Sequence, residues 1–351
     1  MYLPFSSNTK TTLMKKLLPF VLLISFFYSC NQVPVEPPVS NIKILYDKSD
    51  ASQAVVQIFS YDGQTEKNLT NDLAYNYWWP RVSHDNSKFL CYRSIKKGPL
   101  QSDNSTSDYD NAELMVFNID GSNPKLLIYK GKYGWQKQGV AKFSPDGNKI
   151  LMAAYCTDSA RGFTNFEWRL VVTDINGNNP FIISTQNKVF ADPAWSPDGN
   201  KIVYVSLPND KLNGWNDDFE IFVSNYNSTS HEMSNEIRLT NDNLYCFDPD
   251  WSNNGSFITF TTCPFFMTPF NSDIVRVKPD GSDKKILLDD NLSNGVPYFT
   301  PDDKRVYFHT LGLGTTFSIA SCDALNGGDK KIHLLGGVNN ALYSTPQPIF
   351  R

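Results

Sequence analysis

Pro193-Ala194-Trp195-Ser196-Pro197-Asp198-Gly199-Asn200-Lys201-Ile202 is the stretch that decides the fold, because its pattern recurs along the chain. It begins with Pro or Ala, any residue, a mostly aromatic residue and then Ser or Thr. Five other segments follow this pattern wholly or in part: residues 80–83, 141–144, 249–252, 297–300 and 348–351. A Ser-Pro-Asp-Gly turn or a variant follows most copies, and an apolar run comes next. Since Pro presets the second turn position and Gly tolerates the fourth, each copy predicts a strand, a tight turn and a strand.

The copies follow one another at a period of roughly 50 residues, which is typical of β-propeller blades built from short strands. Each unit continues with a third and a fourth predicted strand, for example at 113–118 and 125–129. Because Pro cannot donate to a β-ladder, its strand is expected at a sheet edge against the central channel, with the aromatic residue wedged between blades. We therefore predict an all-β fold, a six-bladed β-propeller of four-stranded antiparallel blades. A β-sandwich would require six coincident matches.

The last copy, 348–351, has no second strand after it, and the missing strand is found near the other end of the sequence. Residues 41–46 (Asn-Ile-Lys-Ile-Leu-Tyr) resemble 200–204, which follow the turn of the third copy. The N-terminal part is therefore expected to supply three strands of the sixth blade, near 42–47, 54–60 and 66–70. The C-terminal part would supply the innermost strand, with 343–350 paired to 42–47, and would so close the ring.

The first 30 residues are predicted to be an export signal. Met14-Lys15-Lys16 precedes an apolar run, 17–28, that is too short to span a bilayer. Ser29-Cys30 ends this run in a layout that resembles a bacterial lipoprotein signal, which implies that Cys30 is lipidated and becomes the mature N-terminus. Simple secretion is the alternative, and either Met1 or Met14 serves as the start.

Residues 31–40 carry three prolines and no periodic pattern, so they are expected to form a stiff, polyproline-like tether. The propeller itself is predicted for 41–351. The protein would then reside in the cell envelope as an outer-membrane lipoprotein, facing the periplasm or the cell surface, with the membrane contacted only through its lipid anchor.

Composition argues against several kinds of function. The chain has 36 acidic and 32 basic residues and no extended basic cluster, which argues against nucleic acid as a partner. Its four histidines are scattered, and the sequence contains no zinc spacing or phosphate loop, so no metal, cofactor or catalytic residue is expected. Carboxylates gather at Asp103 to Asp110 and at Asp210 to Glu220, without the spacing of a calcium loop, and solvated loops are the simplest interpretation.

Export would permit disulfides, and five cysteines remain when Cys30 is set aside. Cys246 and Cys263 are expected near one another on adjacent strands, at the open end of the fourth blade. A bridge between them is a possible outcome, and buried thiols are the alternative.

The repeated Ser-Pro-Asp-Gly-Asn-Lys-Ile phrase, with strands that end in Asn118-Ile119-Asp120-Gly121-Ser122 and Lys278-Pro279-Asp280-Gly281-Ser282, resembles the TolB family over nearly all of 42–351. The resemblance implies a six-bladed propeller and leaves the function open. TolB has a small α/β domain before its propeller, whereas here the strands begin directly after the tether. Related peptidases carry a G-x-S-x-G elbow, and this sequence has none.

The loops between second and third strands are predicted to be long, at 94–111, 157–167, 207–218 and 263–272. They should share one face of the ring with the connections between blades, and this face is rich in aromatic residues. Long loops in compact domains are usually functional, and aromatic rings bind sugars and peptides well. We take Trp78, Tyr133, Trp135 and Trp215 as the candidate ligand-binding residues. The alternative is that these rings cap the channel mouth.

Together these features favour an exported, membrane-anchored propeller that binds an envelope protein, a peptide or a glycan without catalysis. One alternative is a glycan-active lyase or hydrolase that uses loop carboxylates. Another is a scaffold like that of the Tol–Pal system.

Overall fold

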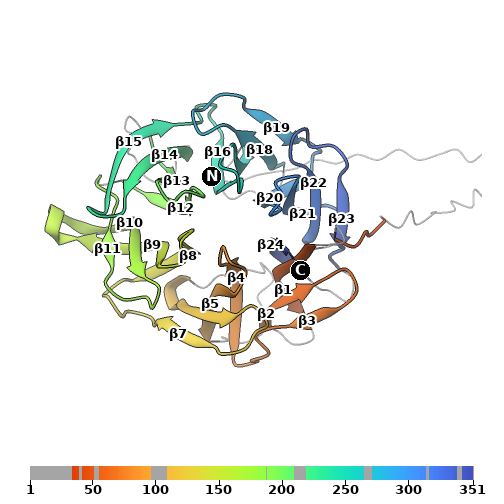
Figure 1. The fold of residues 1–351 in the computed structure, drawn as a ribbon, viewed down its shortest axis with the longest axis horizontal. Coiled ribbons are helices and arrows are strands. Elements are labelled where there is room, and N and C mark those ends of the chain that lie inside the picture. The colour runs from red at the N-terminus through yellow and green to blue at the C-terminus, as the bar shows by residue number, and fades with distance from the viewer. Residues whose placement is uncertain are drawn as a thin grey trace, which may run out of the picture. The chain divides into compact units, whose positions relative to one another are not determined.

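The computed structural model describes residues 34–38, 42–50, 55–95, 109–186, 188–208, 219–264, 271–313, 316–337 and 342–350. These residues form one compact unit, in which six four-stranded antiparallel sheets surround a central channel as blades (Figure 1). The prediction of an all-β, six-bladed propeller is therefore confirmed. Within this described part of the chain, no helix is both long enough and apolar enough to cross a membrane.

The blades are numbered one to six in chain order, and their strands are given from the channel outward. Blade one has β4 (Tyr75–Val82), β5 (Lys88–Ile95), β6 (Glu113–Asn118) and β7 (Lys125–Ile128); blade two has β8 (Lys137–Phe143), β9 (Lys149–Asp158), β10 (Phe163–Asp174) and β11 (Phe181–Ile182). Blade three has β12 (Phe190–Trp195), β13 (Lys201–Ser206), β14 (Glu220–Asn227) and β15 (Glu232–Arg238); blade four has β16 (Tyr245–Trp251), β17 (Ile258–Cys263), β18 (Asp273–Val277) and β19 (Lys285–Leu288). Blade five has β20 (Ser293–Phe299), β21 (Arg305–Leu311), β22 (Ser318–Asp323) and β23 (Lys331–Leu334); blade six has β24 (Leu342–Phe350), β1 (Ile42–Asp50), β2 (Val55–Tyr61) and β3 (Glu66–Asn68). The 3-10 helices η1 (Tyr109–Asn111) and η2 (Ser159–Arg161) precede the third strands of blades one and two.

The Ser-Pro-Asp-Gly motif turns the first strand into the second because its side chains satisfy the backbone of the turn. In blade two the Ser144 hydroxyl donates to Asp146 Oδ1 (2.6 Å) and accepts from the Lys149 N–H (2.9 Å). The same contact joins Ser83 to Asp85, Ser196 to Asp198, Ser252 to Asn254 and Thr300 to Asp302. These turns lie on one face of the ring, which we call the turn face.

Every innermost strand carries a β-bulge, where its pairing with the second strand shifts register. One residue at each bulge has a φ between 44° and 58°: Trp79, Val140, Asp192, Asp248, Val296 and Thr345. Such angles are strained for residues other than Gly and persist only where the surroundings hold them. At two of the bulges, a side chain of the preceding blade holds the backbone in this conformation. The Asp248 N–H donates to Asp192 Oδ2 (3.3 Å), and the Val296 N–H donates to Thr261 Oγ1 (3.2 Å).

Blade six combines strands from both ends of the sequence, as predicted. β24 pairs antiparallel with β1, with Phe350 opposite Ile42 and Leu342 opposite Ser49. The predicted position of the last repeat is wrong by two residues, because Pro348 pairs with β1 as Trp195 pairs with β13. The copy in blade six is therefore 346–349, directly after the bulge, and Pro348 takes the position of the aromatic residue.

The apolar cores lie between neighbouring blades, and the predicted wedge role of the repeat aromatics is confirmed. Phe143 packs into a cluster shared by blades one and two, Trp195 into one shared by blades two and three, and Trp251 into one shared by blades three and four. Each ring is therefore fixed by two blades at once.

One local prediction is wrong, and one open alternative is resolved. Residues 157–167 do not form a long loop, because β9 continues to Asp158 and β10 already begins at Phe163. No disulfide joins Cys246 and Cys263, although both lie in the described residues. Cys246 pairs with Thr262, and Cys263 is the next residue along β17, so the two thiols leave the sheet on opposite faces.

Candidate functional site

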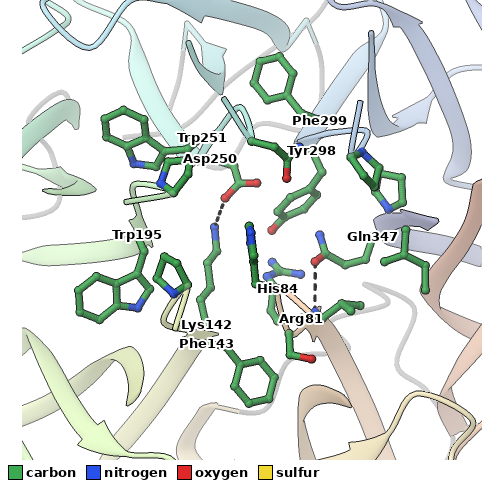
Figure 2. Close-up of a pocket in the computed structure, with 18 of the residues that line it drawn as sticks. Arg81, His84, Lys142, Phe143, Trp195, Asp250, Trp251, Tyr298, Phe299 and Gln347 are labelled. Atoms are coloured by element: carbon green, nitrogen blue, oxygen red, sulfur yellow. Dashed lines mark hydrogen bonds and ion pairs between the residues drawn. The ribbon is translucent and has the colours of Figure 1, made fainter. Parts of the chain in front are cut away.

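The centre of the turn face is hollowed by a cavity of about 190 Å³. Figure 2 shows polar side chains at its middle and aromatic rings around them. In five of the six blades, the polar group comes from the residue two positions beyond the bulge: Arg81, Lys142, Asp250, Tyr298 and Gln347. Blade three has Ala194 at this position, which does not line the cavity. The following residue of each innermost strand forms the wall: Val82, Phe143, Trp195, Trp251, Phe299 and Pro348. The bulges thus determine which residue of each repeat faces the cavity.

An ion pair crosses the channel mouth between blades two and four. Lys142 Nζ lies 2.8 Å from Asp250 Oδ1 and 3.4 Å from the Pro249 carbonyl oxygen. Burial lowers the pKa of Lys142, and the Asp250 carboxylate opposes that change. The pair leaves little net charge at the centre of the cavity floor.

Arg81 is the second cation of the cavity, and it is almost completely buried. Its guanidinium carbon lies 4.8 Å from the centroid of the Tyr298 ring, and its Nη1 donates to the Pro80 carbonyl oxygen (2.8 Å). Burial raises the pKa of Tyr298 well above its ordinary value, so this phenol stays neutral and able to donate.

The cavity walls hold hydrogen-bond donors that lack acceptors. Arg81 Nε, Trp195 Nε1 and Trp251 Nε1 are buried and have no hydrogen-bond partner within the described residues. Buried donors are nearly always paired in native proteins, so three around one cavity call for an explanation.

Three carboxylates lie at the level of the bulges: Asp192 and Asp248 on innermost strands, and Asp47 on β1, the second strand of blade six. Burial raises the pKa of Asp192, and burial together with the Asp192 carboxylate raises the pKa of Asp248 to about 7. Burial also raises the pKa of Asp47 to about 7, although the Arg81 guanidinium and the Trp79 backbone favour its charged form. None of these three is among the residues that line the cavity.

Of the predicted binding residues that the structure describes, Tyr133 and Trp135 lie together and Trp78 does not reach the surface. Trp78 is fully buried between blades one and two and stacks on Tyr92, so the prediction that it is an exposed anchor is wrong. Tyr133 and Trp135 are half-buried, with ring centroids 4.9 Å apart, and the Tyr133 hydroxyl donates to the Gly177 carbonyl oxygen (2.7 Å).

Several predicted sites lie outside the described residues, namely Cys30, Trp215, Asp103, Asp108, Asp210, Asp217 and Asp218. Glu220, the last of the acidic residues grouped at 210–220, begins β14, where a third strand was expected; it is buried and accepts from Arg238 Nη2 (2.8 Å) and the Thr240 hydroxyl. Its carboxylate therefore supports the blade.

Sequence reasoning missed the cavity residues, although the repeat contains a signal for them. In Pro80-Arg81-Val82, Ala141-Lys142-Phe143 and Pro249-Asp250-Trp251, the variable middle residue is the one that reaches the cavity. A position that varies within a structural repeat can determine a binding preference without disturbing the fold.

Comparisons with known proteins agree with this architecture. No family model matches the chain. The Tol-Pal system protein TolB of Ruthia magnifica is 30% identical over 112 residues, which cover 28% of this chain and 26% of that protein. TolB of Methylococcus capsulatus is 45% identical over 54 residues, 15% of this chain and 12% of that protein. The matched segments span about a quarter or less of these relatives.

Among solved structures, TolB from Acinetobacter baumannii aligns with a TM-score of 0.58 and 14% identity, over 90% of this chain and 69% of that one. Hydrazine synthase of Kuenenia stuttgartiensis aligns with a TM-score of 0.62 and 16% identity, over 90% of this chain and 47% of that one. The fold is that of a six-bladed β-propeller, and segments of the repeat sequence are similar to TolB.

Proposed function

We propose that this protein is a non-catalytic binding module of the cell envelope, which holds a segment of a partner protein in the cavity of the turn face. The observation that carries the proposal is the set of three buried donors without acceptors, on Arg81, Trp195 and Trp251, around one cavity. Backbone carbonyls and side-chain carboxylates of a peptide supply acceptors of this kind.

The aromatic wall supports a peptide ligand as well. Buried aromatic and Arg side chains provide much of the binding energy in protein interfaces, and the cavity contains both around a rigid ring. The similarity to proteins of the Tol–Pal system supports an envelope partner in general. A scaffold role like that of the Tol–Pal system is one form of this proposal.

We also propose that Cys30 carries a lipid and ties the propeller to the membrane. The charged start, the short apolar run and Ser29 before Cys30 support this part. The binding face would then work close to a bilayer.

A glycan-active enzyme is the second candidate, favoured by the neighbouring carboxylates of Asp192 and Asp248 with raised pKa values. These acids do not line the cavity. The Asp192 carboxylate accepts a hydrogen bond from the backbone N–H of Asp248, whose own backbone is strained at the bulge. A structural role accounts for them, so binding is the better-supported function.

The test is capture of a partner from envelope extract by the Cys30→Ser chain. Trp195→Phe and Trp251→Phe keep the packing rings but remove one donor each. Each should weaken capture by roughly three- to tenfold, the value of one hydrogen bond. Trp135→Phe on the other face is the matched control and should have no effect. If Trp135→Phe weakens capture and the cavity variants do not, the binding face is the opposite one.

A further inference from the structure

The N-terminal segment of the described chain, 34–38, adds to blade five as a short outer strand. Val35 and Ile332 form a parallel β-bridge, and the Glu36 N–H donates to the Ile332 carbonyl oxygen (2.6 Å). In Figure 1 the first coloured segment of the chain, in red, lies beside β23. We call residues 34–38 the strap.

Side chains of β23 fasten the strap on both sides of this bridge. Lys331 Nζ lies 3.0 Å from Glu36 Oε2. His333 is fully buried against the Tyr307 ring, and its Nδ1 lies 2.8 Å from the Glu36 carbonyl oxygen. Because a carbonyl can only accept, Nδ1 carries the hydrogen, and Nε2 then accepts from the Ser321 hydroxyl (2.8 Å).

Equivalent outer strands provide an internal comparison. Leu126 in β7 and Ile286 in β19 hold the position of Ile332, each after a Lys and each paired with the third strand in the same register. Leu126 is 38% exposed and Ile286 is 51% exposed, whereas Ile332 is 6% exposed. The strap therefore covers an apolar residue that these other outer edges leave open to solvent.

We propose that the strap fixes the point at which the N-terminal segment leaves the ring, and that the outer edge of blade five is the side of the propeller nearest the membrane. This second part rests on the proposed lipid at Cys30. Pro34 follows Cys30 by four residue steps, which reach at most about 14 Å, whereas the twelve steps to Ile42 would reach about 40 Å if the strap were undocked. The ring then stands with its rim toward the bilayer, and the turn face opens sideways.

Hydrogen exchange on the full chain tests the docking, independently of any lipid. Lys331→Glu places two like charges side by side and should speed exchange of the Glu36 amide by roughly tenfold. Lys285→Glu makes the same change at the equivalent position of β19 and should leave that amide unchanged. Fast exchange of the Glu36 amide in the unsubstituted chain would show that the strap is not docked on β23.

The lipidated full chain in phosphatidylethanolamine and phosphatidylglycerol vesicles tests the orientation. A fluorophore is placed on Leu325→Cys in blade five or on Pro180→Cys in blade two, both exposed and both in the turn before an outer strand. Lipids with nitroxide headgroups should quench the blade-five probe roughly twofold or more over the blade-two probe, since only the former is within tether reach. Equal quenching, or more at blade two, overturns the orientation. If the chain does not bind vesicles, the proposed lipid anchor and the proposed orientation are both wrong. The hydrogen-exchange result then decides by itself whether the strap is docked on β23.

Discussion

At the scale of single residues, the serine of the repeat has the clearest role. The Ser144 hydroxyl accepts a backbone N–H and donates to Asp146, so one buried oxygen satisfies both sides of the turn. The sequence predicts this turn because Ser, Pro, Asp and Gly each suit one position of it. It does not predict the burial of the hydroxyl, which depends on the blades on either side.

We expect Ser144→Ala to lower the free energy of unfolding by about 1–3 kcal/mol, because the Lys149 N–H loses its acceptor. The Ser144 hydrogen bond is also the main reason that the pKa of Asp146 is lowered, so this contribution is present above the ordinary pKa and is lost as acid protonates Asp146. Urea unfolding at pH 7 measures the change. Ser122→Ala, at an exposed turn, should cost far less, and equal losses in the two variants would contradict this account.

The channel acids have the opposite dependence on pH. The pKa of Asp248 is raised to about 7, so the folded protein binds this proton more tightly than the unfolded chain. Its contribution to stability is fully present below the ordinary pKa of 3.8 and is lost as the pH rises through about 7. We expect Asp248→Asn to raise the Tm by several degrees at pH 8 and to change it little at pH 4. A lower Tm at pH 8 would show that the charged form is needed.

At the scale of elements, the bulges mark the limit of what sequence reasoning could reach. Strand positions follow from the repeat, and β6 spans the predicted residues 113–118. A bulge shifts register by one residue and reverses which side chains face the core, yet it has no fixed sequence pattern. This explains why a bridge between Cys246 and Cys263 was considered, since the bulge in β16 moves the two thiols to opposite faces of the sheet. Trp78 was expected at the surface because the sequence placed it before the first strand, whereas β4 already begins at Tyr75.

Removal of 341–351 should unfold the whole propeller in one cooperative step. β24 is the innermost strand of blade six, and its loss exposes the edge of β1 and the neighbouring core of blade five. Thermal unfolding followed by circular dichroism measures this. A matched chain with a polar extension after Arg351 should melt normally, and an unchanged Tm in the truncated protein would mean that the ring is stable when open.

At the scale of the whole molecule, the cavity lies on the opposite face of the ring from the one that the sequence predicted as the binding face. The aromatic residues in the connections between blades predicted binding on the face of the long loops, but Trp78 lies in the core. The cavity opens instead on the turn face, because the five short turns leave the channel mouth uncovered there. Sequence alone could not locate it, since the residues that line it come from all six blades and are up to 268 positions apart, from Arg81 to Ile349.

Replacement of Cys30 by Ser should move the protein from the membrane fraction to the soluble fraction, because a lipid chain supplies the proposed anchor. Fractionation followed by immunoblotting measures the shift, and mass spectrometry of the mature N-terminus identifies the acyl group. Cys91→Ser, at a buried cysteine, is the control and should remain with the membrane. An unsubstituted chain that is already soluble would rule out the anchor.

Closure of blade six also places a constraint on the timing of biogenesis. β1 is made early, but its partner β24 emerges only after roughly 300 further residues, which takes about 15–60 s at ordinary rates of synthesis. Through that interval the first blade strands have no ring to join. For the proposed export, this delay keeps the chain unfolded while it is threaded through a channel, and folding is completed only when β24 arrives.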